Sequence, residues 1–266
     1  MDLELKGKIV LITGGSIGIG KGLVDAFARE GAIVVTCARD GKRLEDSLEE
    51  LRRNIPGSRI YGKACDVAEL QQLEDLVAFA DKEAGGIDIL VNNAGTGSAE
   101  KNMTAPDEKW YHYWDLHVMA AIRLARLCVP VMKKRDGESV IIHTTSICAK
   151  QPLEYEPIYN VTKAALSMYS KCLSYELIDD NIRVNTIAPG LMRTPDWNKT
   201  AAIVSKEKGI TPDEYLQNIA DEFAPIKRFG SPEELAQFYL FLCSPKASYC
   251  VGSTYFVDGG WLNVVI

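Results

Sequence analysis

Short runs of apolar, mostly β-branched residues recur along the chain and are separated by longer segments of mixed polarity. Runs of this length and composition predict buried β-strands. The seven predicted strands cover residues 8–13, 32–37, 59–64, 87–91, 139–144, 182–187 and 253–257.

The segments between these runs show the spacing of amphipathic helices. Helices are predicted over residues 19–29, 42–53, 70–83 and 107–134, and over the segment that follows Pro157. Pro130 predicts a kink or break near the end of the fourth helix. Ser231 and Pro232 begin a last helix with a capping residue and a proline at its first position. Residues 190–225 follow neither period, so the pattern predicts no element there.

Continuous apolar strands that alternate with helices predict an α/β fold with a parallel sheet covered on both faces. No linker, internal repeat or low-complexity tract divides residues 1–266, so we expect a single doubly wound domain of about seven strands. In such sheets the site lies at the carboxyl ends of the strands, where the strand order reverses.

Composition and net charge limit the kinds of binding partner and the cellular location that we expect. The net charge is −6 and no basic run is present, which argues against nucleic acid and anionic membranes. The first residues lack a signal-peptide pattern, and no apolar run approaches the roughly 20 residues that span a bilayer. The seven cysteines are scattered singly without a CxxC pair, which favours reduced thiols in a cytoplasmic protein. No metal-ligand spacing occurs, so no metal is predicted.

The chemistry is concentrated between residues 146 and 163. Tyr159 and Lys163 are four residues apart and share one face of the predicted helix. A nearby ammonium should lower the pKa of a phenol, and such a phenol exchanges protons with an alcohol or ketone oxygen. Ser146 can donate a hydrogen bond to the same oxygen. We predict that Ser146, Tyr159 and Lys163 are catalytic.

The first predicted strand ends in a glycine-rich turn. The glycines at 14, 18 and 20 give the pattern TGxxxGxG rather than GxGxxG. Such a turn before a helix lets the backbone approach a phosphate closely. A purely structural turn is the alternative.

Together with further motifs in the same order, these residues resemble the short-chain dehydrogenase/reductase family, including its 3-oxoacyl-[acyl-carrier-protein] reductase-like members. The resemblance covers nearly the whole chain. The motifs are the glycine turn, Asp66-Val67, Asn92-Asn93-Ala94-Gly95, Ser146 with the YxxxK of Tyr159 to Lys163, Pro189-Gly190 with Thr194, Arg228 to Glu234, and Val257-Asp258-Gly259-Gly260.

The resemblance implies a Rossmann fold with a cofactor half at about 1–145 and a catalytic and substrate half at about 146–266. Asp66 would bind the adenine with Val67 beside it, although Asp66 could also be a helix N-cap. Asn92, Ala94 and Gly95 would flank the adenosine ribose, although both Asn92 and Asn93 could be satisfied turn residues. Lys163 would also bind the nicotinamide ribose. The full set of implied cofactor contacts is Gly14, Ser16, Ile17, Gly18, Ile19, Gly20, Arg39, Asp66, Val67, Asn93, Ala94, Gly95, Tyr159, Lys163, Pro189, Gly190, Met192 and Thr194.

The end of the second strand bears on the cofactor. Relatives that use NAD place an acid where this chain has Ala38, and here Arg39 follows. A neutral residue leaves room for a 2′-phosphate, which a guanidinium can bind. Asp40 adds ambiguity, and Arg39 could be a solvated charge. We expect NADP(H), with NAD(H) possible.

One position departs from the family pattern. The fourth catalytic residue is usually an asparagine that helps to hold a water, and the aligned residue here is His117. An imidazole could hold that water as a fourth catalytic residue, and its ordinary pKa of about 6.5 would add pH sensitivity. Alternatively, His117 only packs and binds backbone.

Residues 191–225 match the position of the family's substrate lid. Leu153, Tyr155 and Glu156 should face the substrate cleft, because they lie between Ser146 and Tyr159. Trp197 should face it too, although it could equally anchor the lid. A mixed apolar and acidic pocket suggests a neutral or amphipathic carbonyl compound, whereas Arg193 could bind an acid.

The predicted activity is reversible hydride transfer between NADP(H) and a secondary alcohol or ketone. A rival is a catalytically weak regulatory or scaffold protein that binds a dinucleotide. A sugar-nucleotide epimerase or dehydratase is a second rival, but it usually has a longer chain and a GxxGxxG turn. The resemblance also implies a homotetramer or a homodimer. The apolar run at residues 118–125 suits an interface, or the core alone.

Overall fold

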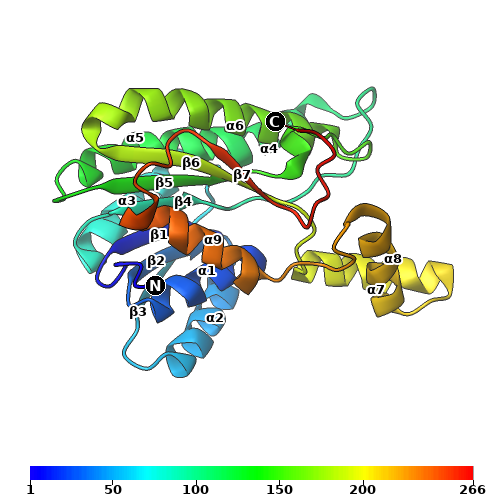
Figure 1. The fold of residues 1–266 in the computed structure, drawn as a ribbon, viewed down its shortest axis with the longest axis horizontal. Coiled ribbons are helices and arrows are strands. Elements are labelled where there is room, and N and C mark those ends of the chain that lie inside the picture. The colour runs from blue at the N-terminus through cyan, green and yellow to red at the C-terminus, as the bar shows by residue number, and fades with distance from the viewer. Residues whose placement is uncertain (266) are drawn as a thin grey trace.

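A parallel sheet forms the centre of the computed structural model, which describes residues 1–265 (Figure 1). The strand order is β3-β2-β1-β4-β5-β6-β7, and each neighbouring pair is parallel. The strands are β1 (Ile9–Thr13), β2 (Ile33–Ala38), β3 (Arg59–Ala64), β4 (Ile89–Asn92), β5 (Ser139–Thr144), β6 (Ile182–Pro189) and β7 (Thr254–Val257). The order reverses between β1 and β4, as the predicted doubly wound fold requires.

All seven predicted strands are confirmed, with bounds that differ from the prediction by at most two residues. Every residue of β1, β4, β5 and β6 is buried. Strands buried on both faces carry continuous apolar runs, which is why the sequence pattern located them well.

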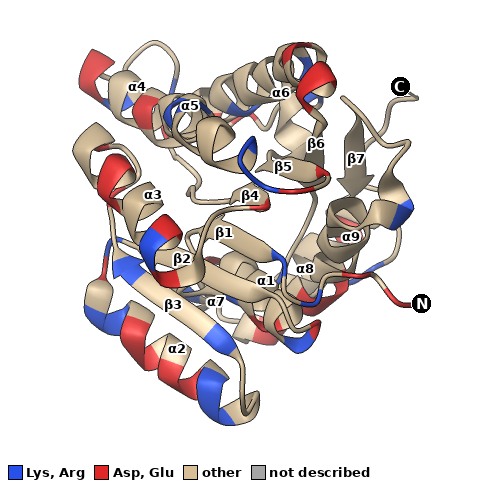
Figure 2. Ribbon diagram, turned by 90° about the vertical axis from the view of Figure 1, so that its left-hand side faces the viewer, with Lys and Arg blue, Asp and Glu red and all other residues tan. Residues whose placement is uncertain are grey.

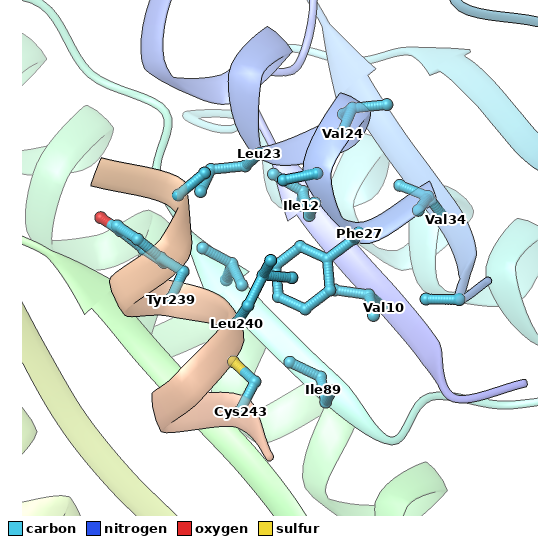
Figure 3. Packing of buried hydrophobic residues seen from close by; sticks show 14 of the residues in the cluster. Val10, Ile12, Leu23, Val24, Phe27, Val34, Ile89, Tyr239, Leu240 and Cys243 are labelled. Atoms are coloured by element: carbon cyan, nitrogen blue, oxygen red, sulfur yellow. The ribbon is translucent and has the colours of Figure 1, made fainter. Parts of the chain in front are cut away.

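Helices cover both faces of the sheet. One face packs against α1 (Gly18–Arg29), α2 (Gly41–Asn54) and α9 (Pro232–Cys243), and Figure 3 shows Phe27 and Leu240 meeting above Val10 and Ile89. The other face packs against α3 (Leu70–Ala84), α5 (Ala120–Met132) and α6 (Pro157–Leu177). Figure 2 shows these layers above and below the strands, with charged residues mainly on the outer helices.

The predicted helix over residues 107–134 is interrupted, but not at the proline. It consists of α4 (Asp107–Trp114), a π-helical turn over Asp115–Met119, and α5. Pro130 lies inside α5, and the helix continues to Met132. A break at Pro130 was therefore wrong: the helix lacks the one backbone hydrogen bond that Pro130 cannot donate, yet it continues for two residues beyond it.

Residues 190–225 contain two helices that the periodicity did not reveal, α7 (Pro195–Lys208) and α8 (Pro212–Phe223). They stand beside the main body of the molecule (Figure 1). Thr211 caps α8 in a reciprocal box with Glu214, the same arrangement that Ser231 and Glu234 form at α9. The pattern Thr-Pro-Asp-Glu was the signal that could have located α8.

Most of the apolar run at residues 118–125 belongs to the core of this chain. Val118, Ala120, Ala121, Leu124 and Ala125 are all buried within it. Met119 and Ile122 of the same run are only half-buried, so the run does not decide between core and interface, and the homotetramer or homodimer stays a prediction. Within residues 1–265, no helix combines the length and the apolar character that a bilayer crossing requires.

Candidate active site

A cavity of about 1100 Å³ opens at the carboxyl ends of the central strands. Residues just after β1, β4 and β5 line it, namely Gly14, Asn93, Thr145 and Ser146, together with Pro189 at the end of β6. The site therefore lies where the strand order reverses, as the fold class predicts.

The glycine turn after β1 is shaped for a phosphate. Gly14 and Gly18 have φ values of +78° and +58°, a conformation that glycine adopts most readily. A Cβ at Gly20 would lie 2.0 Å from the carbonyl oxygen of Gly14, so α1 and the turn touch backbone to backbone. The N-cap of α1, Ile17, makes no side-chain cap, and the first turn carries no acid. Its N–H groups are thus left for an anionic ligand, which fits the pyrophosphate of a dinucleotide.

Thr13 fixes the turn after β4 against the end of β1. Its hydroxyl accepts hydrogen bonds from the N–H groups of Asn93 (3.0 Å) and Ala94 (2.9 Å). The Asn93 side-chain amide donates to the carbonyl oxygen of Thr13 (3.0 Å). These bonds hold the predicted ribose-binding turn in place, and the sequence reasoning had not assigned a role to Thr13.

Two charged residues, Arg39 and Asp40, follow β2 and differ in their contacts. The Asp40 carboxylate accepts a hydrogen bond from the N–H of Arg43 (2.9 Å) and pairs with the guanidinium of that residue (3.1 Å). Asp40 is thus the N-cap of α2, and its pKa is lowered, chiefly by the backbone hydrogen bond. Arg39 lines the cavity and forms no ion pair within residues 1–265.

Ser146, Tyr159 and Lys163 meet at the other end of the cavity. The Ser146 hydroxyl accepts from the N–H of Cys148 (3.2 Å) and lies 3.2 Å from its sulfur. Lys163 is only 3 % exposed, and its Nζ donates to the Thr144 carbonyl oxygen (2.9 Å) while lying 5.4 Å from the centre of the Tyr159 ring. The spacing of four residues on α6 thus brings the ammonium to the phenol, as predicted.

The expected lowering of the tyrosine pKa was wrong for this form of the protein. Burial raises the pKa of Tyr159 above its ordinary value of 10, and the charge of Glu156 adds to this, while the hydrogen bond with Ser146 acts in the opposite direction. Burial also lowers the pKa of Lys163 to about 8. Loss of solvent disfavours the charged form of both groups and outweighs their mutual attraction. The phenol is therefore protonated near neutral pH.

His117 lies behind Lys163 and Tyr159 rather than in the cavity lining. Its Nδ1 is 2.9 Å from the Thr162 hydroxyl, and its Nε2 accepts from the N–H of Thr96 (3.4 Å). Because the Thr162 hydroxyl donates to the Ile158 carbonyl oxygen (2.9 Å), it accepts from Nδ1. Burial lowers the pKa of His117 to about 2, aided by the charge of Lys163. The expected pH sensitivity of His117 is thus overturned, and the packing alternative describes its contacts.

The cavity gathers nearly all the residues that the sequence singled out. Asn92, like His117 and Arg193, is outside its lining, and Asn92 borders a small internal cavity of about 10 Å³ instead. Asp66 lines the main cavity, and its side chain accepts from the N–H of Ala68 (3.0 Å) rather than capping α3, which begins after Glu69. The other predicted residues in the lining are Ser16, Ile17, Ile19, Val67, Ala94, Gly95, Leu153, Tyr155, Gly190, Met192, Thr194 and Trp197.

An apolar cluster encloses the end of the cavity beyond Tyr159. Trp197 lies there and also stacks edge-on against Phe229 with ring centres 5.2 Å apart, so it both lines the cavity and anchors α7. Arg193 does not line the cavity, and its guanidinium binds Asp213 (2.8 Å) instead. Lining residues without a predicted role include Thr96, Gly97, Ser98, Ala99, Lys109, Tyr113 and Trp261. The predicted lid segment contributes Tyr215, Ile219, Glu222 and Phe223, which had not been named individually.

This combination of a doubly wound sheet, an uncapped glycine turn and a Ser–Tyr–Lys group defines a nucleotide-dependent oxidoreductase class. The family model described as Enoyl-(Acyl carrier protein) reductase matches residues 14–262. The chain is 36% identical over 260 residues to Dehydrogenase/reductase SDR family member 4 of Bos taurus, covering 97% of this chain and 88% of the relative. It is 35% identical over 259 residues to 7alpha-hydroxysteroid dehydrogenase of Escherichia coli, covering 97% and 96%.

A solved structure is more similar. L-Sorbose reductase from Gluconobacter frateurii, complexed with NADPH and L-sorbose, superposes with a TM-score of 0.97 and 55% identity over 100% of both chains. The chain therefore belongs to the short-chain dehydrogenase/reductase family. It is an NAD(P)-dependent oxidoreductase of that family.

Proposed function

We propose that this protein reduces a ketone to a secondary alcohol with NADPH and catalyses the reverse reaction with NADP. The observation that carries the proposal is the placement of Ser146, Tyr159 and Lys163 in one cavity with the uncapped glycine turn. The similar reductase from Gluconobacter frateurii was crystallised with NADPH and L-sorbose, so a ketose is the first substrate to test.

Each residue of the group has a distinct task. The Ser146 hydroxyl donates a hydrogen bond to the substrate oxygen and fixes its position. Tyr159, protonated because burial raises its pKa, donates a proton to the same oxygen. The Lys163 ammonium stabilises the phenolate that remains. The nicotinamide, when bound, supplies the hydride to the substrate carbon.

A direct assay tests the proposal. The purified protein should oxidise NADPH, followed at 340 nm, when L-sorbose, D-fructose or 2-hexanone is added. Absence of turnover across these and a wider set of ketones, with NADPH bound, would instead support the regulatory or scaffold rival.

Arg39 should decide the preference for NADPH. We expect Arg39→Ala to raise the KM for NADPH by about 10- to 100-fold, since a hydrogen bond to a charged group contributes about 1.5–3 kcal/mol. The KM for NADH should stay within about twofold, because NADH has no 2′-phosphate. Steady-state kinetics with both cofactors measure the split.

The matched control is Arg53→Ala, which removes the same charge from the exposed end of α2, away from the cavity. It should leave both KM values unchanged. If Arg39→Ala raised the KM values for NADPH and NADH equally, or changed neither of them, Arg39 would not be the 2′-phosphate ligand.

The rate of ketone reduction should fall at alkaline pH. Burial lowers the pKa of Lys163 to about 8, so its ammonium form predominates below pH 8 and is lost as the pH rises. Without that charge the phenolate of Tyr159 is less stable, so kcat/KM for the ketone should drop about tenfold per pH unit above the midpoint, as for loss of one essential proton. A profile measured between pH 7.5 and 10 that stayed level would contradict this role of Lys163.

A further inference from the structure

The start of α6 has an unusual capping arrangement. Glu156 occupies the N-cap position, but its side chain caps no backbone group. The N–H groups that it leaves are bound by the loop after β4. Glu100 accepts from the N–H of Ile158 (3.1 Å), and the Ser98 hydroxyl accepts from the N–H of Tyr159 (3.3 Å).

Because Glu100 and Ser98 bind these N–H groups, the Glu156 carboxylate is not needed to cap the helix. Glu100 also pairs with Lys109 (2.9 Å), whereas Glu156 has no hydrogen-bonded or charged side-chain partner within residues 1–265. Glu156, at the N-cap, lies three positions before Tyr159, and both residues line the main cavity. The carboxylate and the proton donor thus border one space, and the charge of Glu156 contributes to the raised pKa of Tyr159.

The opposite wall is shaped to admit the carboxylate. A Cβ at Gly97 would lie 2.6 Å from Oε1 of Glu156, so a larger residue there would displace the side chain. Burial and the charge of Glu100 raise the pKa of Glu156 to about 7. A half-buried carboxyl group without a partner is unfavourable unless a ligand supplies hydrogen-bond donors.

The surroundings restrict what that ligand can be. Lys163 places an ammonium in the same cavity, which disfavours a cationic substrate. Lys109 also lines the cavity but is paired with Glu100, and Arg193 lies outside the lining and is paired with Asp213. Uncharged hydroxyl groups are therefore the ligand groups that fit this carboxylate, because they donate hydrogen bonds to it without carrying a charge.

We propose that Glu156 is a specificity-determining residue that accepts hydrogen bonds from substrate hydroxyl groups, and that it thereby selects polyhydroxy ketones over plain ketones. The inference rests on the proposed ketone reductase activity. A site built to bind a hydroxyl group discriminates strongly against an analogue that lacks it. Glu156 is not required for proton transfer itself, which belongs to Tyr159.

The test compares L-sorbose with 2-hexanone, a six-carbon 2-ketone without hydroxyl groups. Glu156→Leu should lower the ratio of kcat/KM for L-sorbose to that for 2-hexanone by about 100-fold, chiefly through KM for L-sorbose. Glu156→Gln keeps one acceptor oxygen and should recover part of the ratio. Glu154→Leu is the matched control, since Glu154 is exposed and outside the cavity lining. NADPH binding, followed by fluorescence, should be unchanged in all three variants.

The outcomes separate this inference from the proposed function. If the wild-type protein reduces neither ketone, the proposed function fails. If it reduces 2-hexanone but neither L-sorbose nor D-fructose, or if Glu156→Leu changes the ratio less than threefold, the role of Glu156 is overturned while the reductase activity stands. If the wild-type protein reduces only the hydroxylated ketones, kcat/KM for L-sorbose is compared directly among the variants. A 100-fold lower value in Glu156→Leu, with Glu154→Leu unaffected, supports the inference. A decrease of less than threefold overturns it.

Discussion

Replacement of Tyr159 by phenylalanine is expected to lower kcat for ketone reduction by about a thousandfold, within the range of 10²–10⁴ that a positioned acid contributes. The substitution removes one oxygen and leaves the ring, which lies 5.5 Å from that of His117 and packs in the apolar cluster around the cavity. The substrate oxygen then lacks a proton donor, because the Ser146 hydroxyl can donate a hydrogen bond but is far too weak an acid to replace a phenol. Stopped assays with high enzyme concentration measure the residual rate.

Two further measurements make this result specific. The dissociation constant of NADPH should change less than about threefold, because the ring and Lys163 remain in place and only one hydroxyl is lost. Tyr175→Phe, on the same helix but with its side chain 70% exposed, should keep wild-type activity. A Tyr159→Phe protein with more than a tenth of the wild-type kcat would remove Tyr159 from the proton-transfer role.

The sequence predicted the framework of this molecule better than its electrostatics. Strands buried on both faces are apolar almost throughout, so strands such as β1 could be predicted from their apolar runs. The glycine turn could also be predicted, because few residues other than glycine adopt the positive φ values found at positions 14 and 18. In contrast, α7 buries only Ala201 and Ser205, which leaves no apolar stripe for periodicity to detect.

Charge states depend on burial, which is a tertiary property. Lys163 lies four residues from Tyr159, and from this spacing alone a lowered phenol pKa was the reasonable expectation. The fold instead removes both groups from water, and the pKa of the phenol rises. Likewise, the free carboxylate of Glu156 follows from hydrogen bonds made by Ser98 and Glu100, about sixty residues away in the chain. Neither fact is present in a local pattern.

The second large effect is expected at Gly20, in the first turn of α1. Alanine at this position would place its Cβ 2.0 Å from the carbonyl oxygen and 2.7 Å from the carbonyl carbon of Gly14. Both are backbone atoms, so relief requires α1 to move away from the turn that follows β1. Overpacking of this kind costs about 1–3 kcal/mol of folding free energy. We expect the melting temperature to fall by several degrees and the affinity for NADPH to fall at least about tenfold, the value of one charged hydrogen bond to a phosphate.

Gly57→Ala separates damage to the turn from damage to the fold. Gly57 has a φ of +81° in the connection between α2 and β3, and a Cβ there would meet no atom within 4 Å. Alanine in that conformation costs about 1–2 kcal/mol, so the loss of stability should resemble that of Gly20→Ala. Its affinity for NADPH should equal that of the wild type, because the cavity is not altered. Equal loss of NADPH binding in the two variants would show that general destabilisation is the cause, whereas loss in Gly20→Ala alone assigns the close contact of Gly20 with Gly14 to the phosphate site.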